Sequence, residues 1–136
     1  MTLEFRIRGM EFNTAGDAAS KIKEVLQKSG MEPTLVRRAT IVSFELELNI
    51  IIHAYFGRLR AVIKENCLEI AAKDRGPGIP DIELAMQEGY STAPPFVKEM
   101  GFGAGMGLPN IKKNSDILVV RSRCGAGTFV YSLLKR

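Results

Sequence analysis

The sequence contains no apolar run long enough to cross a membrane, and its N-terminus lacks the pattern of a secretory signal. Its cysteines, Cys67 and Cys124, match no metal-ligand spacing, so we interpret them as reduced structural thiols. No internal repeat, low-complexity tract or linker divides the chain. These absences favour a cytoplasmic protein without a membrane partner, and we expect residues 1–136 to form one domain.

The chain also lacks a strong net charge. The net charge is +4, and the basic residues are scattered along the chain without interleaved aromatic side chains. We therefore expect no nucleic-acid partner. A basic rim for the phosphates of a nucleotide, or for an acidic protein partner, is compatible with this charge.

What the chain does have is a clear order of periodic segments. Alternating apolar and charged residues predict a first strand over residues 3–8. Helical spacing predicts a helix capped by Asn13 or Thr14 that stops at Gly30, and a second from Pro33 to about Tyr55, ended by Gly57. Further strands are predicted over residues 58–64, 67–73, 117–120 and 128–134, and short helices over residues 81–88 and 110–114. This order predicts an α/β (α+β) fold, a two-layer sandwich of helices on a mixed, mainly antiparallel sheet.

Residues 73–80, Lys-Asp-Arg-Gly-Pro-Gly-Ile-Pro, form the most constrained loop of the chain. The ionised Asp74 only accepts hydrogen bonds, which suits the exocyclic amine of a purine. Gly76 and Gly78 permit a positive φ or a close approach to a ligand, while the two prolines fix φ. The loop therefore predicts a single backbone path, at which Gly76 and Gly78 allow a ligand to come close.

A polar stripe lies on the otherwise apolar second helix. Glu45, Asn49 and His53 are spaced four apart and share one face, whereas Glu47 points away from it. A buried helix of this kind needs partners for its polar groups. A lone His at the end of such a helix is most simply a core residue, so the stripe points mainly to Glu45 and Asn49.

Glycines at every second position, Gly101, Gly103, Gly105 and Gly107, lead into a helix with Pro109 near its first turn. Free N–H groups at a helix start bind anions readily. Residues 89–105 have no periodicity, and we interpret them as a nucleotide lid. Phe96, Val97 and Phe102 either form a partner-facing patch or fold onto the lid.

Four stretches resemble, in order, the nucleotide-binding boxes of the gyrase, Hsp90, histidine-kinase and MutL (GHKL) ATPase superfamily: Glu45 with Asn49, residues 74–79, residues 101–108, and Gly127 with Thr128. Within the superfamily the chain resembles the anti-sigma-factor serine/threonine kinases of bacterial partner-switching modules. Residues 76–82, followed by residues 88–92, are closest to the stressosome switch kinase, although the lid is longer and more apolar than that branch suggests.

The resemblance implies a role for each stretch in binding ATP and Mg²⁺. Glu45 would be the catalytic base, and Asn49 would hold Mg²⁺ through its side-chain oxygen. Asp74 would accept from the adenine amine, and Thr128 would reach the base side. The remaining nucleotide contacts would come from Gly76, Gly78, Ile79, Gly103, Gly105, Gly107 and Leu108.

By the same resemblance the protein would phosphorylate a Ser or Thr of a STAS-domain antagonist or scaffold protein. It would alternately hold a sigma factor or a PP2C-type phosphatase, as part of a stress response, and a homodimer stays open. Two other functions also stay open. One is a non-catalytic module in which nucleotide gates protein binding, and the other is the ATPase half of a split histidine kinase.

Overall fold

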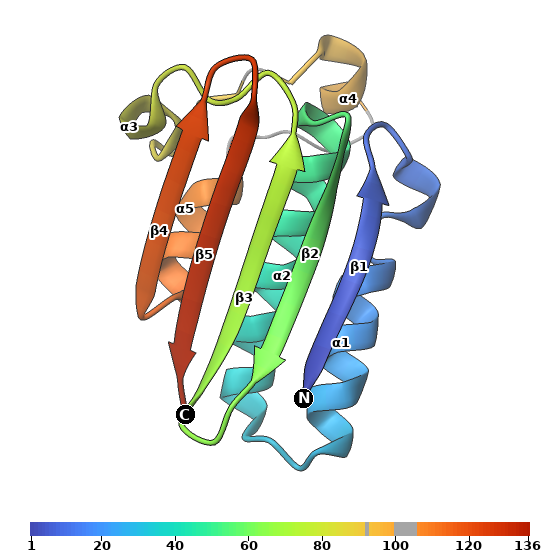
Figure 1. Ribbon diagram of the computed structural model, residues 1–136, viewed down its shortest axis with the longest axis vertical. Coiled ribbons are helices and arrows are strands. Elements are labelled where there is room, and N and C mark those ends of the chain that lie inside the picture. Colours follow the sequence, from blue (N-terminus) through green and yellow to red (C-terminus); the bar gives the residue numbers. More distant parts are fainter. Residues whose placement is uncertain (92, 100–105) are drawn as a thin grey trace.

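The computed structural model describes residues 1–91, 93–99 and 106–136. Its centre is a five-stranded sheet of order β1-β2-β3-β5-β4 (Figure 1). The strands are β1 (Thr2–Arg8), β2 (Phe56–Ile63), β3 (Cys67–Arg75), β4 (Ile117–Arg123) and β5 (Gly127–Lys135). Each pairing is antiparallel. The sheet therefore has no parallel pair among the described strands, although a mixed sheet was expected.

The helices that the structure describes cover only one face of this sheet, so the two-layer α/β sandwich is confirmed (Figure 1). The longer helices of that layer are α1 (Asp17–Lys28), α2 (Pro33–His53) and α5 (Gly107–Asn114). Three shorter elements lie near the upper end of Figure 1: the 3-10 turn η1 (Phe12–Thr14), α3 (Ile82–Ala85) and α4 (Pro95–Glu99). None of the helices in the described part of the chain is long and apolar enough to cross a membrane.

The central helix α2 is buried on almost every side because it lies between the sheet, α1 and α5. Leu46, Ile50 and Ile51 are fully buried along it. Burying a Leu or Ile side chain contributes about 1.5–3 kcal/mol. Glu32 caps its first turn by accepting the backbone amides of Thr34 and Leu35, each at 3.1 Å. The helix is thus a rigid platform for the polar residues it carries.

The start of α1 differs from the expectation that Asn13 or Thr14 caps it. The N-cap residue is Gly16, which has no side chain to offer. Instead the buried carboxylate of Glu47 accepts the backbone amides of Ala18 at 3.2 Å and Ala19 at 3.1 Å. A carboxylate is a favourable cap because the helix start is electropositive. Glu47 therefore serves the packing of α1 on α2, in agreement with its predicted position away from Asn49.

The end of α2 also differs from the prediction. The helix stops at His53, where Ala54 takes an extended conformation. Gly57, expected to end the helix, lies inside β2. A Cβ at Gly57 would come within 2.9 Å of the Lys73 carbonyl oxygen, so this glycine allows a close approach between β2 and β3.

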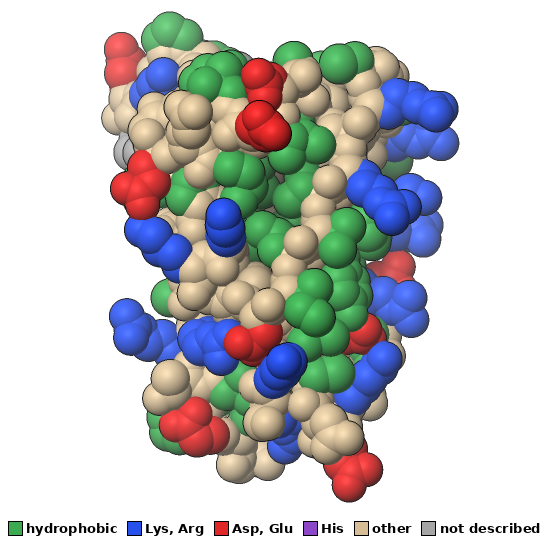
Figure 2. All heavy atoms as spheres, turned by 90° about the vertical axis from the view of Figure 1, so that its left-hand side faces the viewer, with side chains coloured by type: hydrophobic (Ala, Val, Ile, Leu, Met, Phe, Trp, Pro, Cys, Tyr) green, Lys and Arg blue, Asp and Glu red, His purple; other side chains and the backbone are tan. Residues whose placement is uncertain are grey.

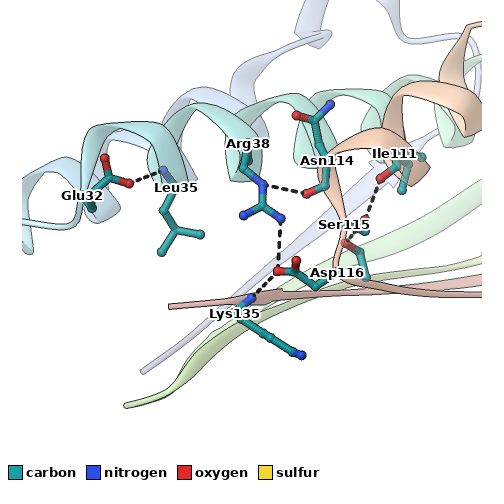
Figure 3. A network of polar contacts seen from close by, with 9 residues as sticks. Glu32, Leu35, Arg38, Ile111, Asn114, Ser115, Asp116 and Lys135 are labelled. Carbon is teal, nitrogen blue, oxygen red and sulfur yellow. Dashed lines mark hydrogen bonds and ion pairs between the residues drawn. The ribbon is translucent and has the colours of Figure 1, made fainter.

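A polar network fixes the far end of α5 (Figure 3). Arg38 of α2 donates to the carbonyl oxygen of Asn114 at 3.3 Å and to the carboxylate of Asp116 at 3.1 Å. Asp116 also accepts the backbone amide of Lys135 at 2.7 Å. Because the C-terminal end of α5 is held by both layers, the direction in which its N-terminal end points is set as well.

Candidate functional site

A cavity of about 350 Å³ is lined by residues of the last turns of α2 and the first turn of α5. These parts of the two helices lie towards the upper end of Figure 1. The wall of the cavity is built from α2, the end of β3, the loop after it, the start of α5 and the start of β5. The predicted residues in this wall are Glu45, Asn49, His53, Asp74, Gly78, Ile79, Gly107, Leu108 and Thr128. Residues from distant parts of the sequence thus meet around one cavity.

One side of the cavity is centred on Asp74. One carboxylate oxygen of Asp74 accepts the backbone amide of Thr128 at 3.1 Å, which ties β3 to β5. The structure gives its other oxygen no partner among the described residues, so that oxygen can accept from a ligand amine. Burial raises the pKa of Asp74, and the hydrogen bond from Thr128 acts in the opposite direction.

Ser122 of β4 holds this side of the cavity together. Its hydroxyl accepts the backbone amide of Ile79 at 2.6 Å and donates to the carbonyl oxygen of Gly127 at 3.1 Å. The Thr128 hydroxyl oxygen lies 2.9 Å from the Ser122 hydroxyl oxygen. Either hydroxyl can donate to the other, and the oxygen of Thr128, which lines the cavity, has lone pairs that a ligand donor can use. Nothing in the sequence singled out Ser122, because it follows an ordinary strand pattern.

The loop after β3 needs glycine at Gly78 for two reasons. Its φ is +80°, and a Cβ there would lie 2.5 Å from the carbonyl oxygen of Arg123. Gly76, by contrast, lies outside the cavity wall. A Cβ on Gly76 would lie 2.9 Å from the Cα of Ala54, so this glycine lets the loop pass against the end of α2.

The opposite side of the cavity is centred on Glu45 and Asn49, one turn apart on α2. The first residue of α5 packs directly against both. A Cβ added to Gly107 would lie 3.1 Å from Oδ1 of Asn49 and 3.3 Å from Oε2 of Glu45. A carboxylate, an amide oxygen and the start of a helix therefore converge within one small volume.

Burial raises the pKa of Glu45, while a hydrogen bond from the Asn110 side chain lowers it. Asn110 lies on α5, one turn after Gly107, and orients the carboxylate. Sequence reasoning did not assign this role, although the spacing from Gly107 places Asn110 on a neighbouring face. His53 lies at the rim of the cavity with part of its side chain exposed to solvent, and not in the core; the protein atoms around the rim partly desolvate it, which lowers its pKa.

At the start of α5 the backbone amides of Gly107 and Leu108 have no partner within the helix, and both residues line the cavity. The N-cap residue of the helix is Met106, which makes no side-chain cap and also lines the wall. Such a helix start suits an anion. The expected contacts of Gly103 and Gly105 lie outside the described residues.

The described part of the lid contains structure that periodicity did not predict. Residues 95–99 form α4, and its Val97 is fully buried in a small cluster with Leu48, Ile52 and Ala93. Phe96 next to it is 48% exposed. Val97 therefore folds inward onto α2 while Phe96 faces solvent; Phe102 lies outside the described residues.

The side chains around the cavity can contribute only a few ligands to a metal ion. No group of three or more His, Cys, Asp or Glu side chains in the described ranges is placed to hold one. The cavity offers instead the amide oxygen of Asn49 and the nearby carboxylate of Glu45. Mg²⁺ accepts few protein ligands when phosphate oxygens and water complete its shell, so these residues fit a nucleotide-bound Mg²⁺.

The family of the chain follows from its relatives. The serine/threonine-protein kinase RsbT of Bacillus subtilis (strain 168) is 32% identical over 115 residues, which cover 82% of this chain and 80% of that protein. The chain belongs to this kinase family. An anti-sigma F factor of Pasteuria penetrans is 32% identical over 138 residues, covering 93% of this chain and 88% of that protein. The predicted kinase family and enzyme class are confirmed, and a kinase of this family uses ATP.

The chain was also compared with protein-family models and with solved structures. No protein-family model matches the chain. The crystal structure of the SiaB-SiaC complex from Pseudomonas aeruginosa is similar with a TM-score of 0.65 and 15% sequence identity, over 97% of this chain and 88% of that chain. At this identity the likeness supports the fold alone.

Proposed function

We propose that the cavity binds Mg-ATP and that this serine/threonine kinase phosphorylates a STAS-domain antagonist protein. It would alternately hold a sigma factor or a PP2C-type phosphatase, in the cytoplasm, with residues 1–136 acting as one ATP-binding kinase domain. The observation that carries the proposal is the convergence of Glu45, Asn49 and Gly107 opposite Asp74. This arrangement gives a phosphate-binding side and a base-binding side within one cavity.

At the base-binding side, the free oxygen of Asp74 would accept from the adenine amine, and Ile79 would pack against the ring. The lone pairs of Thr128 would accept from a donor on the base or from a bridging water. The first amides of α5 would contact the phosphates. Asn49 would hold Mg²⁺, which when bound neutralises negative charge on the phosphates.

At the phosphate-binding side, Glu45 would accept the proton of the attacking Ser or Thr hydroxyl. A bond forms between that hydroxyl oxygen and the γ-phosphorus, the bond from the γ-phosphorus to the bridging oxygen breaks, and ADP leaves with the electron pair. The hydrogen bond from Asn110 keeps the Glu45 carboxylate directed into the cavity. Burial of this carboxylate raises its pKa, which makes it a better proton acceptor.

The direct test is to incubate the purified protein with γ-labelled ATP, Mg²⁺ and a purified STAS-domain protein from the same genome. Label on a Ser or Thr of that protein is the expected result. Nucleotide binding without transfer would favour a non-catalytic module. Acid-labile label on a partner His would favour the ATPase half of a split histidine kinase.

A further inference from the structure

The outer face of the sheet is a second surface of interest, because α1, α2 and α5 all lie on its other side (Figure 1). Side chains alternate between the two faces along each strand. In β2, for example, Leu59 and Ala61 are buried under the helices, whereas Arg58 and Arg60 are exposed. No described helix covers this outer face.

Strand register places cationic side chains next to one another on this face. Arg6 lies opposite Arg58, Arg58 opposite Lys73, Lys73 opposite Phe129, and Phe129 opposite Arg121. The cationic members of this row are all exposed. We call this the cationic row. Like charges directly opposite each other destabilise a sheet, so the row is not explained by the stability of the fold.

The next row towards the upper end of Figure 1 has the same character. Arg8 lies opposite Phe56, Phe56 opposite Arg75, and Arg123 follows on β4. Phe56 is 55% exposed. Glu4 places a counter-charge beside this surface, with its carboxylate 3.6 Å from Arg58. Figure 2 views the β4 side and shows Lys and Arg side chains gathered along its upper right border, where the outer face is seen edge-on.

Below the cationic row the β4 and β5 part of the same face is largely apolar, while Glu69 of β3 lies beside it, opposite Leu133, and is paired with Lys64 and Tyr131. Ile117 lies opposite Leu133, and Val119 opposite Tyr131. Ile117 is 47% exposed, and the other three are partly buried. The outer face thus joins an aliphatic and aromatic half to a cationic half.

We propose that this outer face is the docking surface for a protein partner that presents carboxylates beside an apolar centre. Complementary charge brings such a partner to the cationic row, and its apolar part covers Ile117 and Val119. A nucleic acid would use the cationic row but gain nothing from the aliphatic half. A second copy of the chain would bring a like-charged face towards the cationic row.

The docking surface shares strands with the cavity but lies on the other side of the sheet. Lys73, Phe129 and Arg121 each immediately neighbour a residue of the base-binding side, namely Asp74, Thr128 and Ser122. Neighbouring residues of a strand point to opposite faces. A protein bound to the outer face therefore does not block the cavity, so docking and phosphate transfer can be measured separately.

The experiment uses the sigma factor and the PP2C-type phosphatase of the same genome as purified probes, and only this choice of probes rests on the proposed function. Binding is measured by biolayer interferometry at low and high salt. The variant carries Lys73→Glu with Arg121→Glu; the new carboxylate at position 73 faces Arg58, which favours folding, as a thermal melt will verify. The matched control carries Lys23→Glu with Arg37→Glu, an equal charge change at exposed positions of α1 and α2.

We expect one probe to bind the variant at least about ten-fold more weakly, mainly through slower association and with less salt dependence. The control should bind that probe as the unchanged protein does. Ile117→Ser should also weaken binding, because the apolar half loses contact area.

Four results would overturn the proposal. The first is that neither probe binds the unchanged protein. The second is that a probe binds the unchanged protein and all variants equally well. The third is that an oligo(dT) of about 20 nucleotides binds the unchanged protein and binds the charge variant more weakly, but binds Ile117→Ser as before; the ligand would then be a nucleic acid. The fourth is that the unchanged protein proves to be a dimer and that Ile117→Ser dissociates it. Phosphate transfer to the STAS-domain protein, measured in parallel, reports on the proposed function alone.

Discussion

The Asp74 carboxylate and the Thr128 backbone amide are joined by a hydrogen bond of 3.1 Å between β3 and β5. One carboxylate oxygen therefore fixes the strands, and the other keeps its hydrogen-bonding capacity in a residue that lines the cavity. An Asp in this position is held rigidly before any ligand arrives, which lowers the entropic cost of binding. Strand pairing thus orients the base-binding side of the cavity.

Asp74→Asn should weaken ATP and ADP binding without unfolding the protein. The Asn oxygen can still accept the Thr128 amide, but its NH₂ group would then face the cavity and meet another donor, the adenine amine. Loss of a hydrogen bond to a charged group costs about 1.5–3 kcal/mol, which corresponds to roughly ten- to a hundred-fold in affinity. Isothermal titration calorimetry measures this, and unchanged affinity in a folded variant would contradict the assigned base site.

Ser122→Ala should also weaken nucleotide binding, although Ser122 is not expected to touch the nucleotide. Its hydroxyl holds the Ile79 amide at 2.6 Å and directs the Thr128 hydroxyl, so both lose their orientation in the variant. We expect the unpaired amide to lower the free energy of unfolding by about 1–3 kcal/mol. Thermal unfolding measures this loss, and calorimetry measures the accompanying loss of ATP affinity. Ser122→Thr keeps the hydroxyl and should restore part of both.

Ser43→Ala is the matched control for that change. Ser43 is fully buried on α2, and its hydroxyl has no hydrogen-bond partner among the described residues. Removing an unsatisfied hydroxyl should leave stability unchanged or raise it slightly. Equal losses in Ser43→Ala and Ser122→Ala would mean that the Ser122 contacts carry no special weight.

Gly107→Ala should separate function from stability. Alanine favours a helix interior over glycine by about 1 kcal/mol, and at Gly107, the first residue of α5, the gain is at most that. The added Cβ, however, would press on Asn49 Oδ1 at 3.1 Å and Glu45 Oε2 at 3.3 Å. We expect a thermal melt at least as high as that of the unchanged protein together with weaker Mg-ATP binding. Full Mg-ATP affinity would show that Glu45 and Asn49 need not keep these positions.

Val97→Ala should loosen the described part of the lid. Val97 is fully buried against Leu48 and Ile52, and its truncation removes about two buried carbons at ~0.8 kcal/mol each. Hydrogen exchange over residues 93–99 should then be about ten-fold faster, and Mg-ATP should slow exchange in the unchanged protein. Phe96→Ala, at an exposed neighbour, is the control. Exchange that is the same in both variants would mean that α4 is not anchored through Val97.

Local pattern was enough to predict most elements of this fold. Strand alternation gave β1 and the β2–β3 hairpin, and Pro33 opens α2 as expected. The stripe on α2 and the loop of Asp74 needed only helical spacing and turn chemistry, and the cavity wall contains both. These features depend on residues that are close together in the sequence.

What could not be predicted depends on contacts between distant segments. The cap of α1 comes from Glu47, which lies on the following helix. The hydroxyl of Ser122 on β4 accepts the backbone amide of Ile79, which lies in the loop after β3. The members of the cationic row are scattered in the sequence because they lie on different strands, and only the register brings them side by side. The register itself follows from the packed core.

Glu45 and Asn49 share a face of α2, but their proposed roles predict different losses. Glu45→Gln keeps size and removes basicity, so ATP should still bind while phosphate transfer falls about 10²–10⁴-fold. Asn49→Ala should weaken Mg²⁺-dependent ATP binding and transfer together. Single-turnover transfer and calorimetry distinguish these outcomes, and wild-type transfer by Glu45→Gln would remove Glu45 from the chemistry.

The same variant has a signature in stability. Burial raises the pKa of Glu45 above its ordinary value of 4.5. The folded state therefore binds the proton more tightly than the unfolded chain, and its stabilising contribution is complete below the ordinary pKa. That contribution is lost as pH rises through the raised pKa, the same window in which Glu45 becomes an active base. Glu45→Gln does not titrate, so its free energy of unfolding without nucleotide should lack this fall and exceed that of the unchanged protein near neutral pH. Urea unfolding at several pH values measures it; parallel pH profiles for the two proteins would mean that Glu45 is not desolvated in the cavity.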